Sequence, residues 1–94
     1  MTPDLSIIVV NWNTRDLLRD CLAAIAASTG VTIETIVIDN GSTDGSPAMV
    51  ESEFPDVRLI ANQSNRGFAA ANNQGLAVAR GRYHLLLNLS LIHI

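Results

Sequence analysis

The sequence contains no lysine. Its six basic residues are all arginine, and nine acidic residues bring the formal net charge to −3 over 94 residues. Charged residues make up 16% of the chain, against about a quarter in typical globular proteins. A basic surface of the kind that binds nucleic acid or an anionic membrane is therefore not expected. The single cysteine, Cys21, cannot form an internal disulfide, so nothing indicates an oxidising compartment, and we expect a cytoplasmic protein.

Long apolar runs are also missing. Continuous β-branched stretches are short, as at residues 7–10, whereas a membrane-crossing helix needs about 20 apolar residues. We therefore expect neither a transmembrane segment nor a signal peptide. Hydrophobic residues nevertheless make up 48% of the chain, which excludes disorder by composition and supplies a core. A length of 94 residues allows one domain at most, since a domain typically has about 150.

Short apolar runs alternate with helical stretches. Strands are predicted at residues 5–10, 32–39, 57–61 and 83–87, where β-branched and other apolar residues cluster. Helices are predicted between them, the first from Asn13 as N-cap to Gly30, the second from Ser46 as N-cap to Phe54, and the third over residues 67–80. The order β-α-β-α-β-α-β predicts an α/β fold, an open and mostly parallel sheet with helices on both faces.

The first predicted helix has one apolar face, which should pack on the sheet. That face consists of Leu17, Leu18, Cys21, Leu22 and Ile25. Cys21 is accordingly expected in the core. His84 lies in the apolar fourth strand, which favours a buried or edge histidine over a ligand.

Polar residues stand at the ends of all four predicted strands, although the residues before them are apolar. In an open parallel sheet, ligands bind outside the carboxyl ends of the strands. We therefore predict a ligand site at these ends, with the alternative that the loops are polar only because they face water. The candidate residues are Val10, Asn11, Trp12 and Asn13 after the first strand, Asp39, Asn40 and Ser42 after the second, Arg66 and Gly67 after the third, and Asn88 after the fourth.

The turn after the first strand contains no glycine. The glycine-rich dinucleotide fingerprint and the P-loop are therefore both excluded. A nucleotide diphosphate bound here would need another neutraliser for its phosphates, and a divalent metal is the usual one.

Asp39 is the most informative of the candidate side chains. An ionised carboxylate accepts hydrogen bonds only, so it suits the N3–H of uracil or thymine, or the N1–H and amino group of guanine. Its alternative role is to cap the following loop. Arg66 stands near the start of the third helix, where a cation opposes the helix dipole, and this favours contact with a base or phosphate over a merely solvated position. Trp12 can either stack on a base or pack in the fold.

Three runs together resemble glycosyltransferase family 2, whose members have the GT-A fold. They are SIIVVNWNTRDLLRDCLAAI at residues 6–25, IVIDNGSTDGS at residues 36–46, and NQSNRGFAAANNQGLAVARGRYHLLLN at residues 62–88. The chain looks most like the bacterial rhamnosyltransferase-type branch. The resemblance implies that residues 1–88 form the N-terminal, nucleotide-sugar-binding half of a GT-A domain.

The resemblance also implies an activity for the complete parent enzyme. It would transfer a sugar from a UDP- or dTDP-linked donor to a hydroxyl of a glycan or lipid-linked glycan, in cell-envelope polysaccharide synthesis. It would use Mg or Mn and work in the cytoplasm, associated with the membrane from that side. Residues 10–13 match the segment that lines the nucleoside, Asp39 the acid that holds the base, and Arg66 with Gly67 the loop beside the base. Asn88 matches the first position of the metal motif.

After Asn88 the sequence departs from the family. Leu89 and Ser90 follow where the branch has Pro-Asp, so a neutral hydroxyl replaces the metal-binding carboxylate. No residue present matches the catalytic base that the acceptor hydroxyl needs. We therefore expect no catalytic residue, no metal site and no activity in this chain. We expect residues 89–94, which include His93, to be a non-native tail.

Two other functions stay open at this point. A non-enzymatic nucleotide-binding or interaction module fits the loss of the metal carboxylate. A sugar nucleotidyltransferase fits less well, because that class needs a glycine- and arginine-rich loop after the first strand.

Overall fold

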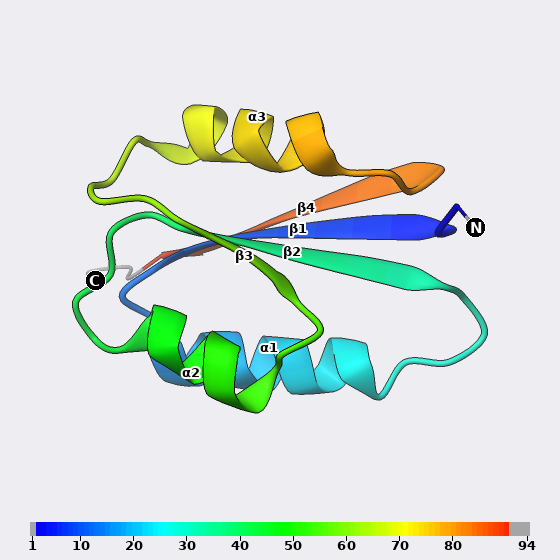
Figure 1. Ribbon diagram of the computed structural model, residues 1–94, viewed down its shortest axis with the longest axis horizontal. Helices are drawn as coiled ribbons and strands as arrows, with labels where there is room; N and C mark the ends of the chain where they lie inside the picture. Colours follow the sequence, from blue (N-terminus) through cyan, green and yellow to red (C-terminus); the bar gives the residue numbers. More distant parts are fainter. Residues whose placement is uncertain (1, 91–94) are drawn as a thin grey trace.

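Four parallel strands form one sheet between two layers of helices in the computed structural model, which describes residues 2–90 (Figure 1). The strands lie in the order β3-β2-β1-β4, and every neighbouring pair is parallel. The predicted α/β fold with helices on both faces is therefore confirmed. The elements are β1 (Leu5–Trp12), α1 (Arg15–Ala26), β2 (Ile33–Asp39), α2 (Ser46–Glu53), β3 (Arg58–Ala61), α3 (Phe68–Val78) and β4 (Tyr83–Ser90).

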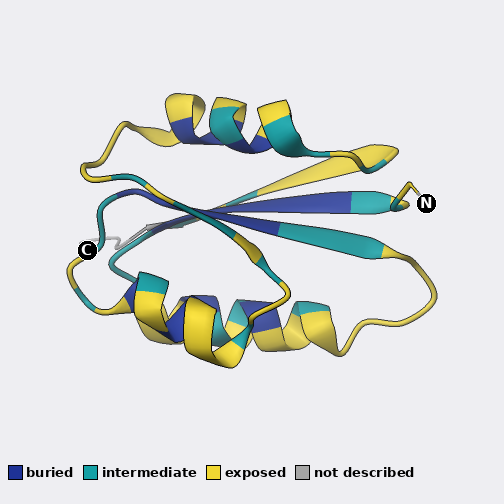
Figure 2. Ribbon diagram, in the orientation of Figure 1, coloured by how far each residue is buried: buried dark blue, intermediate teal, exposed yellow. Residues whose placement is uncertain are grey.

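The two central strands are buried on both faces, as their continuous β-branched runs predict. Alternate residues of β1 point to opposite sides: Ile7 and Val9 join the core on the α1 and α2 side, whereas Ile8 and Val10 join the core on the α3 side. Figure 2 shows this burial along β1 and the second half of β2. Helix α3 packs closely, because a Cβ on Gly75 would lie 2.5 Å from Cγ2 of Ile8.

The N-caps of the first two helices each differ from the prediction by one residue. Thr14 rather than Asn13 holds the N-cap position of α1, and Gly45 rather than Ser46 holds that of α2. Neither N-cap residue caps its helix with its own side chain. Asn13 instead has a left-handed backbone, with φ at 55°. The Asp44 carboxylate accepts the first N–H of both helices. It lies 29 residues from the start of α1, so no local signal marks its contact with that helix.

Helix α1 is shorter and less buried than its pattern indicated. It ends at Ala26 rather than continuing to Gly30. Leu18 and Leu22 are fully buried, whereas Leu17 is 52% exposed and Cys21 is half-buried. Leu17 was therefore wrongly assigned to the apolar face, because it lies about 100° around the helix from Leu18.

Strands β1 and β4 extend beyond their predicted ends. Their register continues through Asn11 with Leu89 and Trp12 with Ser90. Asn88 consequently lies inside β4 rather than after it, because backbone pairing with β1 holds polar residues in the strand. The expected tail thus begins within β4, and residues 91–94 lie outside the described part of the chain.

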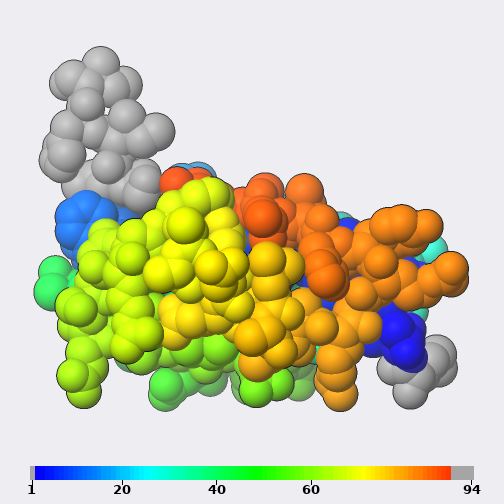
Figure 3. Space-filling view, turned by 90° about the horizontal axis from the view of Figure 1, so that it is seen from above, coloured from blue at the N-terminus to red at the C-terminus, as the bar shows by residue number. Residues whose placement is uncertain are grey.

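Strand β4 forms one edge of the sheet and is only partly covered. Tyr83, Leu85 and Leu86 are exposed, and so is His84, which makes His84 an edge histidine. Viewed from the α3 side, the side chains of β4 lie on the surface beside α3 (Figure 3). Within residues 2–90, no helix has the length and apolar character to cross a membrane.

Candidate functional site

The parallel register brings the polar strand ends together at one end of the sheet. Asn11 pairs with Asp39 across β1 and β2, and Val10 pairs with Asn88 across β1 and β4. Asn11 and Asp39 each lie two residues after a member of the core on the α1 and α2 side, Val9 and Val37. The alternation of side chains therefore places both polar groups on the α1 and α2 face.

Asp39 lies at the centre of a buried polar cluster. Asp39 is 1% exposed and Asn11 is 0% exposed. The Oδ1 atom of Asp39 accepts hydrogen bonds from Asn11 Nδ2 at 3.0 Å and from the Ser42 hydroxyl at 2.7 Å, while its Oδ2 atom accepts the Ser42 N–H at 2.9 Å. The carboxylate therefore caps the loop that follows β2, which is the second of the two roles that its sequence position allowed.

Two hydrogen bonds of Asn13 tie the turn after β1 to the loop after β2, and a third bond braces the turn itself. The Asn13 N–H donates to the Ser42 hydroxyl oxygen at 2.9 Å, and the Thr43 N–H donates to Asn13 Oδ1 at 2.8 Å. The Thr14 hydroxyl donates to Asn11 Oδ1 at 2.6 Å. The left-handed backbone of Asn13 is held by these contacts, and such strain is often found at functional sites.

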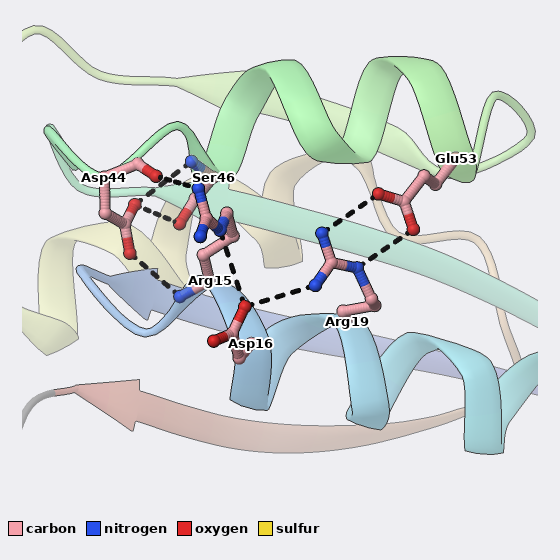
Figure 4. Close-up of polar contacts among 6 residues, drawn as sticks. All are labelled: Arg15, Asp16, Arg19, Asp44, Ser46 and Glu53. Carbon is pink, nitrogen blue, oxygen red and sulfur yellow. Dashed lines mark hydrogen bonds and ion pairs between the residues drawn. The ribbon is translucent and has the colours of Figure 1, made fainter.

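Asp44 caps both α1 and α2. Its Oδ2 atom accepts the Arg15 N–H at 2.9 Å, and its Oδ1 atom accepts the Ser46 N–H at 3.0 Å together with the Ser46 hydroxyl (Figure 4). Burial opposes ionisation of Asp44, but the hydrogen bonds from Ser46 and Arg15 outweigh it and lower the pKa of the carboxyl. The residue therefore stays ionised at neutral pH.

A second polar cluster lies on the α3 side. Asn40 is buried. Its Nδ2 donates to the Gly67 carbonyl at 3.2 Å, and its Oδ1 accepts from Asn62 Nδ2 at 3.1 Å and from the Arg66 N–H at 3.3 Å. Asn62 and Gln74 exchange two hydrogen bonds, of 2.7 and 2.9 Å. These contacts fix the loop before α3, including the left-handed Gly67 with φ at 86°.

The loops after β2 and β3 touch at Gly41. A Cβ on Gly41 would lie 2.9 Å from Cα of Ser64, and the backbone of Gly41 has φ at 85°. Only glycine fits without a shift of one loop, since both the space and the conformation exclude a side chain. The two polar clusters are therefore held close to each other.

The structure does not join all the predicted residues into one contact network. Asn11, Asn13, Asp39 and Ser42 form the first cluster, and Asn40, Arg66 and Gly67 contribute to the second. Val10 belongs to the core on the α3 side, and Trp12 is half-buried at the end of β1. Arg66 and Asn88 are exposed at the same end of the sheet, where a ligand can reach them.

The residues at the end of β4 do not fit a divalent cation. Mg²⁺ and Mn²⁺ prefer carboxylate oxygens, whereas residues 88–90 are Asn, Leu and Ser. Within residues 2–90, no group of three or more His, Cys, Asp or Glu side chains is placed to hold a metal. The nearby Asp39 carboxylate already accepts three hydrogen bonds. These residues at the end of β4 therefore offer a divalent cation no carboxylate ligand.

The larger surface hollow and the polar clusters lie at opposite ends of the sheet. A hollow of about 810 Å³ opens at the amino end of the sheet, where Leu22, Ile25, Phe54 and Val57 form much of its wall. A smaller hollow of about 370 Å³ lies at the polar end, lined by residues 13–17 and by Asp44. We place the site at the polar end, because the buried hydrogen-bonding groups gather there.

The sequence interpretation missed four residues that organise this end. Asp44 had a local signal, because an Asp two residues before a helix start can accept its first N–H. Thr14 stands at an N-cap position that was assigned to Asn13. The Asn62–Gln74 pair joins residues of separate elements, so no local pattern reveals it.

Comparison with known proteins identifies related chains. The family model described as Glycosyl transferase family 2 matches residues 6–89. The chain is 39% identical over 87 residues to succinoglycan biosynthesis protein ExoO of Rhizobium meliloti (strain 1021), covering 92% of this chain and 25% of that protein. It is 32% identical over 77 residues to the N-acetylglucosaminyl-diphospho-decaprenol L-rhamnosyltransferase of Mycobacterium tuberculosis (strain CDC 1551 / Oshkosh), covering 82% of this chain and 25% of that protein.

A solved structure shares the fold. The mannosyltransferase PcManGT from Pyrobaculum calidifontis, in complex with GDP-Man and Mn²⁺, superimposes with a TM-score of 0.72 and 30% sequence identity. The match covers 84% of this chain and 25% of that one. This chain thus spans about a quarter of the length of the relatives it matches.

Proposed function

Because the chain belongs to glycosyl transferase family 2, we propose that it binds a nucleotide diphosphate sugar at the carboxyl ends of its strands. It forms the donor-binding part of an enzyme that transfers the sugar to an acceptor hydroxyl. The family, the GT-A fold and the likeness to a rhamnosyltransferase, which the sequence predicted, are confirmed by the comparisons. The observation that carries the proposal is the buried cluster of Asn11, Asp39 and Ser42 at the ends of two parallel strands.

Asp39 is the proposed acceptor for the base. Within the described chain, its Oδ2 atom accepts one hydrogen bond, from the Ser42 N–H. A carboxylate oxygen has two lone pairs, so Oδ2 retains one for an N–H of uracil or thymine. Because Asp39 is 1% exposed, the base reaches it only when groups that cover the carboxylate move aside. Guanine has a suitable N–H as well, and the mannosyltransferase relative was solved with GDP-Man.

The other candidate residues surround this acceptor. Of the candidate residues 10–13, Trp12 and Asn13 are proposed to line the nucleoside, because Val10 lies in the core and Asn11 is fully buried. Trp12 is available to stack on the base.

Asn40 and Gly67 hold the loop that carries Arg66, and the exposed guanidinium of Arg66 is the proposed contact for the base or the diphosphate. Asn88 lies on β4, where it pairs with Val10 of β1. The base that deprotonates the acceptor hydroxyl is not assigned to any residue of this chain.

The parent reaction and its setting are proposals as well. We propose a glycan or lipid-linked glycan as acceptor, in bacterial cell-envelope polysaccharide synthesis on the cytoplasmic side of the membrane. The names of the succinoglycan and decaprenol-linked relatives support this acceptor class. The expected Mg or Mn ion of the parent is supported by the Mn²⁺ in the mannosyltransferase complex. That residues 1–88 form a donor-binding unit stays a prediction. The assignment of residues 89–94 as a non-native tail stays a prediction as well.

Calorimetric titration with UDP, dTDP and GDP tests the proposed function. We expect saturable binding of UDP or dTDP by the wild-type chain and its loss in Asp39→Asn. Asp56→Asn is the matched control, because it removes one acidic charge from an exposed position at the opposite end of the sheet. Absence of binding for all three nucleotides, or equal loss in both variants, contradicts the proposal.

A non-enzymatic interaction module is the second candidate, and one observation favours it. The Asn-Leu-Ser sequence at the end of β4 provides no carboxylate for a metal. A chain with that role alone should not respond to any nucleoside diphosphate, so the same titration separates the two functions.

A further inference from the structure

Asp44 stands where two parts of the proposed site meet. The turn after β1 carries Asn13, and the loop after β2 carries Ser42. Asp44 accepts the first N–H of α1, from Arg15, through Oδ2, and the first N–H of α2, from Ser46, through Oδ1. One carboxylate thus joins the starts of two helices, as Figure 4 shows.

We propose that Asp44 is a positioning residue for nucleotide binding, whose carboxylate holds the turn after β1 against the loop after β2 so that Asn13 and Ser42 face the donor. This inference rests on the proposed function. No contact of Asp44 with the nucleotide is needed, because the residue acts through the two segments that it joins.

Three features of the described chain support this role. The N-cap residues Thr14 and Gly45 make no side-chain cap of their own, so Asp44 supplies the cap for both helices. Arg15 Nη1 donates in return to the Asp44 carbonyl at 3.0 Å, which closes a ring between the two segments. The Thr43 N–H, next to Asp44, donates to Asn13 Oδ1 at 2.8 Å, so displacement of Asp44 also affects Asn13.

The rest of the ionic cluster in Figure 4 does not share this role. Arg19 pairs with Asp16 at 3.1 Å and with Glu53 at 3.0 Å, and the Asp16 side chain is 79% exposed. Exposed pairs of this kind contribute little to stability. Asp16 also pairs with Arg15 at 3.5 Å, so its removal would disturb the contacts between Arg15 and Asp44. Asp20 is exposed on α1 and its side chain makes no hydrogen bond or ion pair within residues 2–90, so Asp20→Asn is the charge-matched control.

The test combines nucleotide titration with amide hydrogen exchange. Asp44→Ala is expected to raise the Kd for UDP or dTDP about tenfold. It should also speed exchange of the Asn13 and Thr43 amides about tenfold or more. The loss of one helix cap corresponds to roughly a tenfold change in an equilibrium constant. Asp44→Asn, which keeps an oxygen for one of the two helices, should give a smaller change. Asp20→Asn should match the wild type in both measurements.

Exchange at Val37, in the buried centre of β2, separates local loosening from general destabilisation. Unchanged exchange at Asn13 and Thr43 in Asp44→Ala, or an equal increase at Val37, overturns the inference. If the wild-type chain binds no nucleotide, the proposed function fails, and the exchange rates then decide by themselves whether Asp44 holds the two segments.

Discussion

Ser42 meets Asp39 with both of its donors. Its hydroxyl donates to Oδ1 at 2.7 Å and its backbone N–H donates to Oδ2 at 2.9 Å. The Ser42 hydroxyl oxygen also accepts the Asn13 N–H at 2.9 Å. A serine three residues after the acid therefore organises the carboxylate and the neighbouring turn together.

Removal of the Ser42 hydroxyl should destabilise the chain. In Ser42→Ala, Asp39 Oδ1 loses one donor and the Asn13 N–H loses its acceptor. We expect the free energy of unfolding to fall by about 1–3 kcal/mol, the usual effect of leaving buried polar groups unpaired. Urea denaturation measures it. Ser28→Ala is the control, because the exposed Ser28 hydroxyl donates to the Ala24 carbonyl near the end of α1, away from the site. An equal loss there would refute the role of Ser42.

Gly41→Ala should destabilise the chain more than Gly30→Ala does. Both glycines have a left-handed backbone, with φ at 85° and 91°, so both variants carry a conformational cost of about 1–2 kcal/mol. A Cβ at Gly41 would also lie 2.9 Å from Cα of Ser64, whereas nothing lies within 4 Å at Gly30. Thermal unfolding of the two variants compares them directly, and equal losses would show that the two loops do not press on Gly41.

Asn72→Leu should stabilise the chain. Asn72 is 6% exposed, and its Oδ1 atom has no hydrogen-bond partner in the described part of the chain. An apolar side chain of similar shape removes the desolvation cost of that acceptor, which is about 1–3 kcal/mol. A rise in the free energy of unfolding by about 1 kcal/mol is therefore expected in chemical denaturation. A fall would mean that Asn72 has a partner in solution.

The stability of the chain should fall in acid partly through Glu34. Burial raises the pKa of Glu34, but hydrogen bonds from the Arg80 N–H, the Ser6 hydroxyl and the Arg80 guanidinium outweigh this, and the net pKa is lowered. A carboxyl with a lowered folded-state pKa stabilises the fold above its unfolded pKa of about 4.3, and that contribution disappears as the pH falls through the lower folded value.

Glu34→Gln tests this dependence. The variant is expected to be less stable than the wild type at pH 7, and the difference should shrink as the pH falls below about 4. Unfolding measured between neutral and strongly acidic pH checks the trend. A difference that stays constant over this range would contradict the assignment. The pKa of Asp44 is also lowered. The Glu34→Gln variant should therefore still lose stability as the pH falls, because Asp44 is unchanged in it.

Much of the fold followed from local patterns. The buried runs around Ile8 and Val37 identified the central strands, and the helical stretches between them required parallel crossovers. Asp39 and Asn11 were recognised because polar residues at the ends of apolar strands stand out in the sequence. The ends of elements were less predictable, since α1 takes its cap from Asp44, which lies 29 residues further along the chain.

The order of strands and helices, the family and the candidate residues at the strand ends could all be predicted from the sequence, because periodicity, turn residues and motif spacing are local properties. How these residues contact one another depends on the tertiary structure. It divides them into a cluster around Asp39 and a cluster around Asn40, because adjacent residues of a strand point to opposite faces of the sheet. It also places one carboxylate at two helix starts, because that contact depends on how separate segments pack together.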